Sequence, residues 1–229
     1  MELIKFSKVS FGYPNFPYLL SHFDFSIHHG DYYYLTGRNG AGKTTFLKLI
    51  YGEEQPILGD LFVFGVNTKL MNEAELASIR QNIGIVFQDS KLIPHLTLCE
   101  NIALPLQILG EYKKSAMEKA KALLDWVDMS YEYAKKPDEI SDGQKKRVCI
   151  ARAVITKPLI ILADEPTANL DIENSQKIMK LLETVNQNGT PIVCVTHHEN
   201  IIEWYPHPKI LLDKGILFFE SKVKKKKTA

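Results

Sequence analysis

The residues with the clearest chemical potential lie in the stretch GRNGAGKTT, residues 37 to 45. It fits the pattern G-x-x-x-x-G-K-[ST], in which glycines let backbone N–H groups point inward and surround phosphates. Lys43 would reach the terminal phosphates, and the hydroxyl of Thr44 would ligate Mg²⁺. A glycine turn that merely precedes a helix is the alternative. The strand expected before the stretch and the helix expected after it favour a site for a nucleoside triphosphate.

A second set of candidate residues is the acidic pair that ends LIILADE, residues 159 to 165. An apolar strand ending in an acid places Asp164 at the carboxyl end of a parallel strand, where such sheets bind ligands. Asp164 would hold Mg²⁺ through water, and Glu165 would orient or deprotonate an attacking water. Acidic pairs also occur at solvated strand edges and as helix caps. The phosphate-loop pattern elsewhere in the chain favours the catalytic interpretation.

The hydrophobic pattern indicates the elements that must position these residues. Aromatic and β-branched residues between turns predict partly antiparallel strands at the start of the chain. Short apolar runs that then alternate with helical patterns indicate an α/β fold with a parallel sheet covered on both faces. The stretch from 90 to 157 has helical spacing and no convincing strand, which predicts a helical insertion. The expected strands are 2–11, 23–29, 31–36, 84–87, 159–163 and 191–195, and a helix is expected from Asp171 to Asn188.

Composition narrows the class of protein. The chain has 229 residues, of which 45% are hydrophobic and 24% charged, values typical of a soluble globular protein. Its three cysteines, Cys99, Cys149 and Cys194, are widely spaced and odd in number, so neither a disulfide framework nor a cysteine metal site is expected. The N-terminus lacks the apolar core of a signal peptide, and no apolar run approaches the roughly 18 residues of a membrane helix. We therefore expect a cytoplasmic protein.

The charge is concentrated at one end of the chain. The last nine residues, SKVKKKKTA, contain five lysines and no acid. Without these five charges the net charge of +1 becomes −4 for the rest of the chain. A solvated terminus is the simpler interpretation of this basic tail at 221–229. Attraction to anionic lipid, at roughly 1 kcal/mol for each lysine near the surface, is the alternative.

Further short motifs occur in a characteristic order. VFQD contains Gln88, ISDGQ spans 140 to 144, ANLD spans 168 to 171, and VTHH contains His197. Together with the phosphate loop and LIILADE, they resemble the motifs of ABC transporter ATP-binding subunits, and the resemblance covers residues 2 to 220. It implies a P-loop NTPase sheet with an N-terminal antiparallel β part and an inserted helical subdomain. The implied ABC ATPase domain is 1–220, with a nucleotide-binding core at 1–89 and 158–220 and a helical signature subdomain at 90–157.

The resemblance implies ATP and Mg²⁺ as ligands and gives each motif a role. Glu165, His197 and Gln88 would form the catalytic group, with His197 contacting the γ-phosphate. Mg²⁺ would be held by Thr44, Gln88 and Asp164. The residues expected to bind nucleotide are Tyr13, Gly37, Asn39, Gly40, Ala41, Gly42, Lys43, Thr44, Thr45, Ser141, Gly143 and Gln144.

Tyr13, in FGYPN, would stack on adenine by the same matching, with Phe11 and Phe16 as rivals. Without a nucleotide, an aromatic residue there would be a core or edge residue. The pair His197 and His198 invites a metal interpretation, but adjacent residues on an extended strand point to opposite sides, which argues against it.

Two residues depart from the family pattern. His198 stands where many relatives carry Asp. The usual L-S-G-G-Q is here Ile140, Ser141, Asp142, Gly143 and Gln144, so an acid replaces the first glycine. An acid in the first turn of a helix stabilises it by about 0.3 to 1 kcal/mol, whereas a carboxylate about 6 Å from the γ-phosphate would repel it by roughly 3 kcal/mol. Because Ser141 and Gly143 are retained, we expect Asp142 to point outward and ATP hydrolysis to be retained.

The resemblance implies that two copies pair head to tail on ATP and pass their motion to an integral membrane partner, a permease or a protein of the FtsX type. Several stretches, among them the one from 79 to 108, most resemble cell-division ATPases of the FtsE type. Such a protein lies on the inner face of the cell membrane, and no nucleic acid is expected as a partner. Lipoprotein-release and efflux ATPases share much of the pattern, and importer subunits are a further possibility. A different class is an ATP-dependent scaffold or switch in which Asp142 limits hydrolysis.

Overall fold

The computed structural model describes residues 1–220, which form two compact units. The first unit contains residues 1–80 and 191–220, and the second contains 81–190. The predicted basic tail at 221–229 lies outside the described residues. The second unit is larger than the helical subdomain predicted at 90–157, because it also includes two strands and a helix that pack with the inserted helices.

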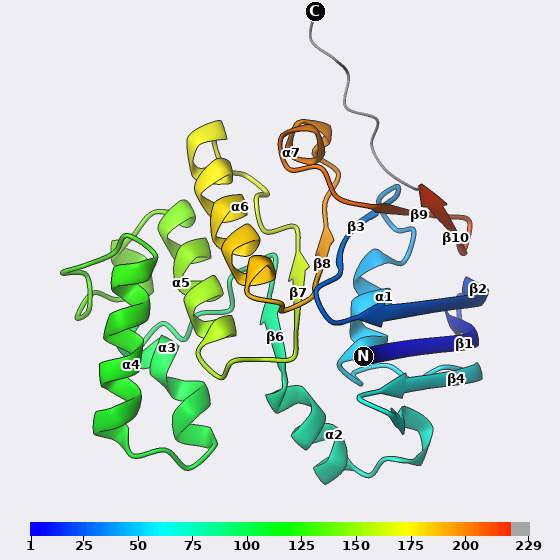
Figure 1. Ribbon diagram of the computed structural model, residues 1–229, viewed down its shortest axis with the longest axis horizontal. Coiled ribbons are helices and arrows are strands. Elements are labelled where there is room, and N and C mark those ends of the chain that lie inside the picture. Colours follow the sequence, from blue (N-terminus) through cyan, green and yellow to red (C-terminus); the bar gives the residue numbers. More distant parts are fainter. Residues whose placement is uncertain (221–229) are drawn as a thin grey trace, which may run out of the picture. The chain divides into compact units, whose positions relative to one another are not determined.

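The first unit contains two sheets, shown in Figure 1. One is antiparallel, in the order β2-β1-β4-β5, and alternating burial along β1 shows that one face of it is covered. In the other, β3 lies between β8 and β9 and is parallel to both, and β10 is antiparallel to β9. These strands are β1 (Glu2–Tyr13), β2 (Phe16–His28), β3 (Tyr32–Thr36), β4 (Leu58–Val63), β5 (Val66–Asn67), β8 (Ile192–Val195), β9 (Lys209–Asp213) and β10 (Ile216–Glu220).

The helices of the first unit include the one that follows the phosphate loop. Phe46 on α1 lies 4.9 Å from Phe6 of β1 and 5.9 Å from Phe23 of β2, measured between ring centroids. These aromatic contacts anchor the helix to the antiparallel sheet. The helices of this unit are α1 (Lys43–Ile50), α2 (Glu73–Gln81), α7 (Glu199–Trp204) and the short 3-10 helix η1 (Thr68–Leu70).

The second unit combines a parallel strand pair with four α-helices. Every residue of β7 is buried, as expected for a parallel strand covered on both faces. A hydrophobic core that includes Leu98, Ile102, Leu124 and Val148 joins the helices. The elements are β6 (Ile83–Val86), β7 (Ile160–Asp164), α3 (Leu98–Ile108), α4 (Lys113–Trp126), α5 (Asp142–Val154), α6 (Ile172–Gln187) and η2 (Pro137–Glu139).

Each expected strand and the expected helix after ANLD is present, and most ends differ from the expected bounds by one or two residues. The exception is β2, which begins at Phe16, seven residues before the expected start at 23. The expectation that 90–157 is helical holds in the described chain, where its elements are α3, α4, η2 and α5. The sequence analysis did not include the strands β4, β5, β9 and β10 or the helices α2 and α7. Among residues 1–220, none of the helices is both long and apolar enough to cross a membrane.

Candidate nucleotide-binding site

The phosphate-loop stretch lies between β3 and α1 in the first unit. Gly42, the N-cap of α1, has a φ of 103°. A Cβ on Gly37 would lie 2.3 Å from the carbonyl oxygen of Leu212 in β9, so only glycine fits there. The first turn of α1 contains no acidic side chain, so no carboxylate of that turn neutralises the positive end of the helix dipole. The stretch therefore has the geometry and polarity of an anion site at a helix N-terminus.

Lys43 folds back over this loop. Its side chain is buried, and its Nζ donates to the carbonyl oxygens of Gly37 at 2.8 Å and Arg38 at 3.1 Å. An ammonium group has three donors, so these bonds fix its position and leave capacity for an anion. The next residue, Thr44, is exposed, whereas Thr45 is buried. Of the two hydroxyls, that of Thr44 is therefore the one placed for a cation ligand.

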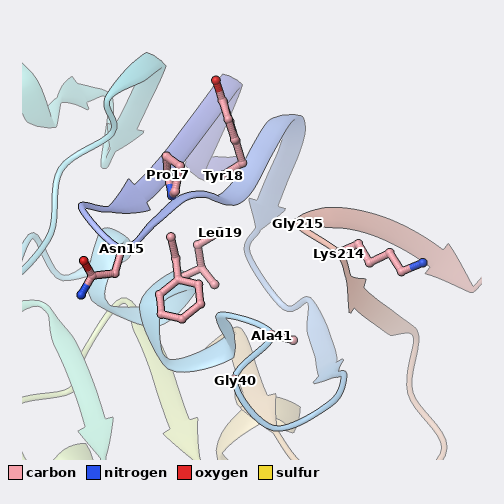
Figure 2. Close-up of a pocket in the computed structure, with 9 residues that line it drawn as sticks. Asn15, Pro17, Tyr18, Leu19, Gly40, Ala41, Lys214 and Gly215 are labelled. Atoms are coloured by element: carbon pink, nitrogen blue, oxygen red, sulfur yellow. The ribbon is translucent and has the colours of Figure 1, made fainter.

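A pocket of about 360 Å³ opens beside the phosphate loop (Figure 2). Its lining comes from the start of β2, from Gly40 and Ala41 of the loop, and from the turn between β9 and β10. Figure 2 shows Leu19 directed toward the loop and Tyr18 directed away from it. Phe16 lines this pocket and is 67% exposed, so it offers a large apolar surface next to the phosphate loop.

The three aromatic candidates for adenine stacking differ in their surroundings. Phe11 is only 5% exposed, and its ring packs edge-on against Tyr13 with centroids 5.0 Å apart. The hydroxyl of Tyr13 donates to Oε1 of Glu54 at 3.0 Å, a contact that orients the half-buried ring. Burial leaves Phe11 without an open face, whereas Tyr13 and Phe16 both remain partly accessible. Glu54 was missed in the sequence analysis because it lies 41 residues from its partner.

The acidic pair lies in the second unit, where β7 ends at Asp164 and Glu165 follows. Both residues are buried, with exposed fractions of 9% and 7%. Glu165 has a φ of 46°, a left-handed conformation that costs a non-glycine residue about 1–3 kcal/mol and is common at functional sites. The parallel pairing of Val86 in β6 with Ala163 in β7 brings the carboxyl ends of both strands to one edge. The exposed Gln88, two residues after β6, leaves from that same edge.

The signature motif begins α5. Ser141 is the N-cap: its Oγ accepts from the backbone N–H of Gln144 at 3.3 Å, and the Gln144 side chain accepts from the Ser141 N–H at 2.9 Å. The Ser hydroxyl still carries its own proton after accepting this bond. The N–H of Gly143 belongs to the first turn, whose N–H groups have no acceptor within the helix. The hydroxyl of Ser141 and the N–H of Gly143 are therefore placed as donors at a helix N-terminus.

Asp142 faces solvent in the described chain. Its side chain is 75% exposed, and its Oδ1 lies 3.0 Å from Nζ of Lys145, one turn along α5. The carboxylate is thus paired along its own helix, and its direction relative to a nucleotide on a second copy stays a prediction.

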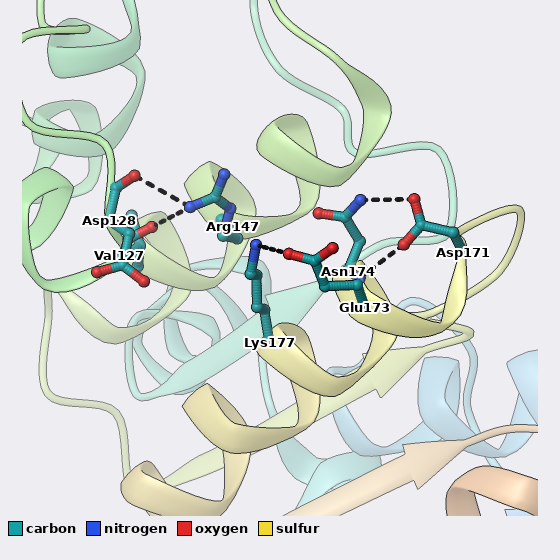
Figure 3. A network of polar contacts seen from close by, with 7 residues as sticks. All are labelled: Val127, Asp128, Arg147, Asp171, Glu173, Asn174 and Lys177. Atoms are coloured by element: carbon teal, nitrogen blue, oxygen red, sulfur yellow. Dashed lines mark hydrogen bonds and ion pairs between the residues drawn. The ribbon is translucent and has the colours of Figure 1, made fainter.

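Gly143 faces inward, because a Cβ at this position would lie 2.9 Å from Cγ of Asn174 in α6. Figure 3 shows Asn174 bonded to Asp171, the last residue of ANLD and the N-cap of α6. The signature and the ANLD motif thus meet through this asparagine.

The two histidines do not point to opposite sides, so that part of the sequence argument is wrong. Their ring centroids lie 4.3 Å apart with an interplanar angle of 31°. The reason is that β8 ends at Val195, so neither histidine belongs to the strand, and the N–H of His198 turns back to Oγ1 of Thr196 at 3.2 Å. His197 is exposed in this arrangement.

The loop and helix of the first unit define a P-loop nucleotide-binding domain of the α/β class. The chain belongs to the ABC transporter family, whose model matches residues 20–168. It is an ATP-binding subunit of that family, which confirms both the resemblance and the fold class expected from the sequence.

The chain is similar over nearly its whole length to cell-division ATP-binding proteins FtsE. The FtsE protein of Bacillus subtilis is 37% identical over 215 residues, 94% of each chain. That of Haemophilus influenzae is 40% identical over 216 residues, 94% of this chain and 99% of the relative. The methionine import ATP-binding protein MetN of Latilactobacillus sakei is 42% identical, but the match covers 80% of this chain and 54% of MetN.

Two solved structures of the ATP-binding cassette MJ0796, both dimeric, share this fold. The cassette in a post-hydrolysis state bound to ADP and Pi has a TM-score of 0.86 and 32% identity, with 99% of this chain and 100% of that chain covered. The other structure is described as a bacterial ABC transporter cassette, with the same TM-score of 0.86 and 33% identity.

Proposed function

We propose that this chain binds and hydrolyses ATP as a homodimer and drives an integral membrane partner in cell division, as an FtsE-like subunit. The phosphate loop carries the nucleotide part of the proposal, because buried Lys43 is bonded to the loop and the following helix presents its N-terminus. The full-length similarity to FtsE proteins supports the cell-division part.

Each site residue has a proposed task. The loop residues 37–45 hold the phosphates, and Tyr13 stacks on adenine, with Phe16 as its rival because it lines the adjacent pocket. Thr44, Gln88 and Asp164 would hold Mg²⁺, which would supply positive charge to the phosphate oxygens.

The buried carboxylate of Glu165 orients or deprotonates the attacking water. His197 contacts the γ-phosphate, and Gln88 positions the water. Ser141, Gly143 and Gln144 cap the nucleotide held by the second copy. The dimeric structures of the similar cassette support pairing of two copies.

The membrane partner is proposed to be a protein of the FtsX type, which the chain would join from the cytoplasmic face of the membrane. Two alternatives remain within the family: the ATPase of a lipoprotein-release or efflux transporter, and an importer subunit, which the 42% identity to a methionine importer favours. An ATP-dependent switch with little hydrolysis is the alternative from another class, motivated by Asp142.

The decisive experiment compares the Mg-ATPase activity of the purified chain with that of Glu165→Gln. Size-exclusion chromatography in the presence of ATP shows whether either protein forms a dimer. We expect turnover in the wild type, loss of at least a hundredfold in Glu165→Gln, and an ATP-trapped dimer of that variant. Lys43→Ala is the matched control, which should lose both turnover and dimer because it removes the phosphate contact. A dimer without turnover in the wild type would favour the switch, and equal turnover in all three proteins would refute the proposed site.

Co-expression with an FtsX-type membrane protein tests the cellular role. If the chain is retained on that membrane protein, and cells depleted of the chain become filamentous, the proposed role in cell division would be supported. Retention on an importer permease instead would support the importer alternative.

A further inference from the structure

The segment from Phe87 to Lys91, which contains Gln88, has an unusual backbone. Ser90 and Lys91 follow one another with φ values of 59° and 48°, left-handed conformations that only glycine adopts without cost. Two local backbone hydrogen bonds lie within the segment: the N–H of Ser90 donates to the carbonyl oxygen of Phe87 at 3.2 Å, and that of Lys91 to the carbonyl oxygen of Asp89 at 2.5 Å. Such strain persists only where surrounding groups hold the backbone in place.

One face of α5 supplies those groups. Lys146 donates from Nζ to the carbonyl oxygen of Phe87 at 3.1 Å and also to that of Gln88. Cys149 donates from Sγ to Ser90 at 2.9 Å. Arg152 donates to Ser90 at 2.8 Å and to Lys91 at 2.7 Å. The three donors are spaced three residues apart along α5, so they lie on the same side of the helix.

Lys146 is the one of these three donors whose burial costs the most free energy. The residue is 4% exposed, and within residues 1–220 its ammonium forms no ion pair. Burial lowers the pKa of Lys146, and the carboxylates of Asp89, Asp164 and Asp142 offset that effect only in part. An apolar side chain would fill the position without desolvating a charge. What the lysine adds is a rigid link between the carbonyl of Gln88 and the helix that begins with the signature.

We propose that Lys146 is a positioning residue that makes the glutamine segment, Phe87–Lys91, and the signature end of α5 move as one body. Lys146 follows Ser141, the N-cap of α5, by five positions, roughly 7.5 Å along the helix axis, a distance that a single helix keeps constant. The inference rests on the proposed function, in which Gln88 serves the nucleotide of its own subunit and Ser141 caps the nucleotide of the other. Lys146 then couples the two nucleotide sites of the dimer.

Lys146→Met tests this link, because methionine fills a similar volume without an N–H donor. The matched control is Lys145→Met, the same change at the neighbouring position, which removes only the surface ion pair with Asp142. Lys146→Gln is the conservative variant, since its amide keeps two donors on a side chain one bond shorter. Amide hydrogen exchange at Ser90 and Lys91 reports on the segment without nucleotide, while ATP affinity, kcat and KM report on its effect on the reaction.

In Lys146→Met we expect the amides of Ser90 and Lys91 to exchange at least tenfold faster than in the wild type, and kcat to fall at least tenfold. The dissociation constant for ATP should stay within threefold of the wild type. Lys145→Met should match the wild type in all these measurements, and Lys146→Gln should fall between the wild type and Lys146→Met. Unchanged exchange in Lys146→Met would overturn the link, and faster exchange with unchanged kcat would overturn its role in positioning Gln88.

The two proposals can fail separately. An inactive wild type would refute the proposed function, and the link between Lys146 and the glutamine segment would then be tested by amide exchange alone. If Lys146→Met does not fold, Arg152→Met removes the bonds at the other end of the segment and is judged by the same exchange criterion.

Discussion

Replacing Asp142 by asparagine removes one charge and leaves the size of the side chain unchanged. The carboxylate, which is 75% exposed, stabilises the folded chain in two ways. Its surface ion pair with Lys145 contributes about 0.2–1 kcal/mol, and its interaction with the helix dipole contributes about 0.3–1 kcal/mol. Since both effects are screened by solvent, Asp142→Asn should lower the free energy of unfolding by about 0.5–1 kcal/mol. Lys145→Met should lose only the ion-pair part, so the difference between the two variants measures the dipole effect. Denaturant unfolding followed by circular dichroism gives both values.

The ATPase rate of the same variant tests where the carboxylate points. Because Asp142 is paired within its own helix, we expect the activity of Asp142→Asn to stay within twofold of the wild type. A carboxylate about 6 Å from a γ-phosphate would repel it by roughly 3 kcal/mol at an effective dielectric near 20, or about a hundredfold in dimer closure. A gain of tenfold or more in Asp142→Asn, lost again at high salt, would refute the outward orientation.

Two further predictions concern packing. Gly143→Ala should lower the free energy of unfolding by about 1–3 kcal/mol, because its Cβ would lie 2.9 Å from Asn174. Adding Asn174→Ala to the same chain should recover at least 1 kcal/mol, and additive losses of the two changes in denaturant unfolding would contradict the contact. The thiols Cys99, Cys149 and Cys194 are all buried, and burial raises the pKa of the first two, so a thiol reagent at pH 8 should label none in the native protein and three in urea.

The parts of the site that could be predicted are those determined by short stretches of sequence. The phosphate loop is one of them, because glycines at fixed positions before a lysine have few other uses. The acids after β7 are another, since a continuous apolar run identifies a buried parallel strand and hence its carboxyl end. Gln88, by contrast, was assigned from the family resemblance.

The strands that were missed lack such local signals or pair with distant partners. The sequence of β4, LGDLFV, contains a glycine and an acid, and its pairing with β1 joins residues 48 to 59 positions apart. The hairpin of β9 and β10 did carry a signal, because Lys214 and Gly215 between them have the positive φ values of a tight turn, and Lys-Gly is a weak version of the usual Asn-Gly.

Side-chain contacts across the chain could not be predicted at all. Lys146 reaches carbonyls 58 and 59 residues earlier, and nothing local to either segment indicates the pairing. The spacing of Lys146 with Cys149 and Ile150 does place it on the buried face of α5, and this was the only signal available. A buried lysine on an otherwise apolar helix face is a reason to search for backbone acceptors.

The contacts of α5 show how a single helix can connect several parts of the second unit. Near its start, Gly143 packs against Asn174 of α6. On another side, Arg147 donates to the carbonyls of Val127 at 2.7 Å and Asp128 at 3.1 Å, just beyond the end of α4 (Figure 3). With Lys146 bonded to the glutamine segment, α5 is tied by side chains to three different parts of the second unit. A membrane partner that displaced α4 would therefore move the signature and Gln88 together, which is the coupling a transmitted motion requires.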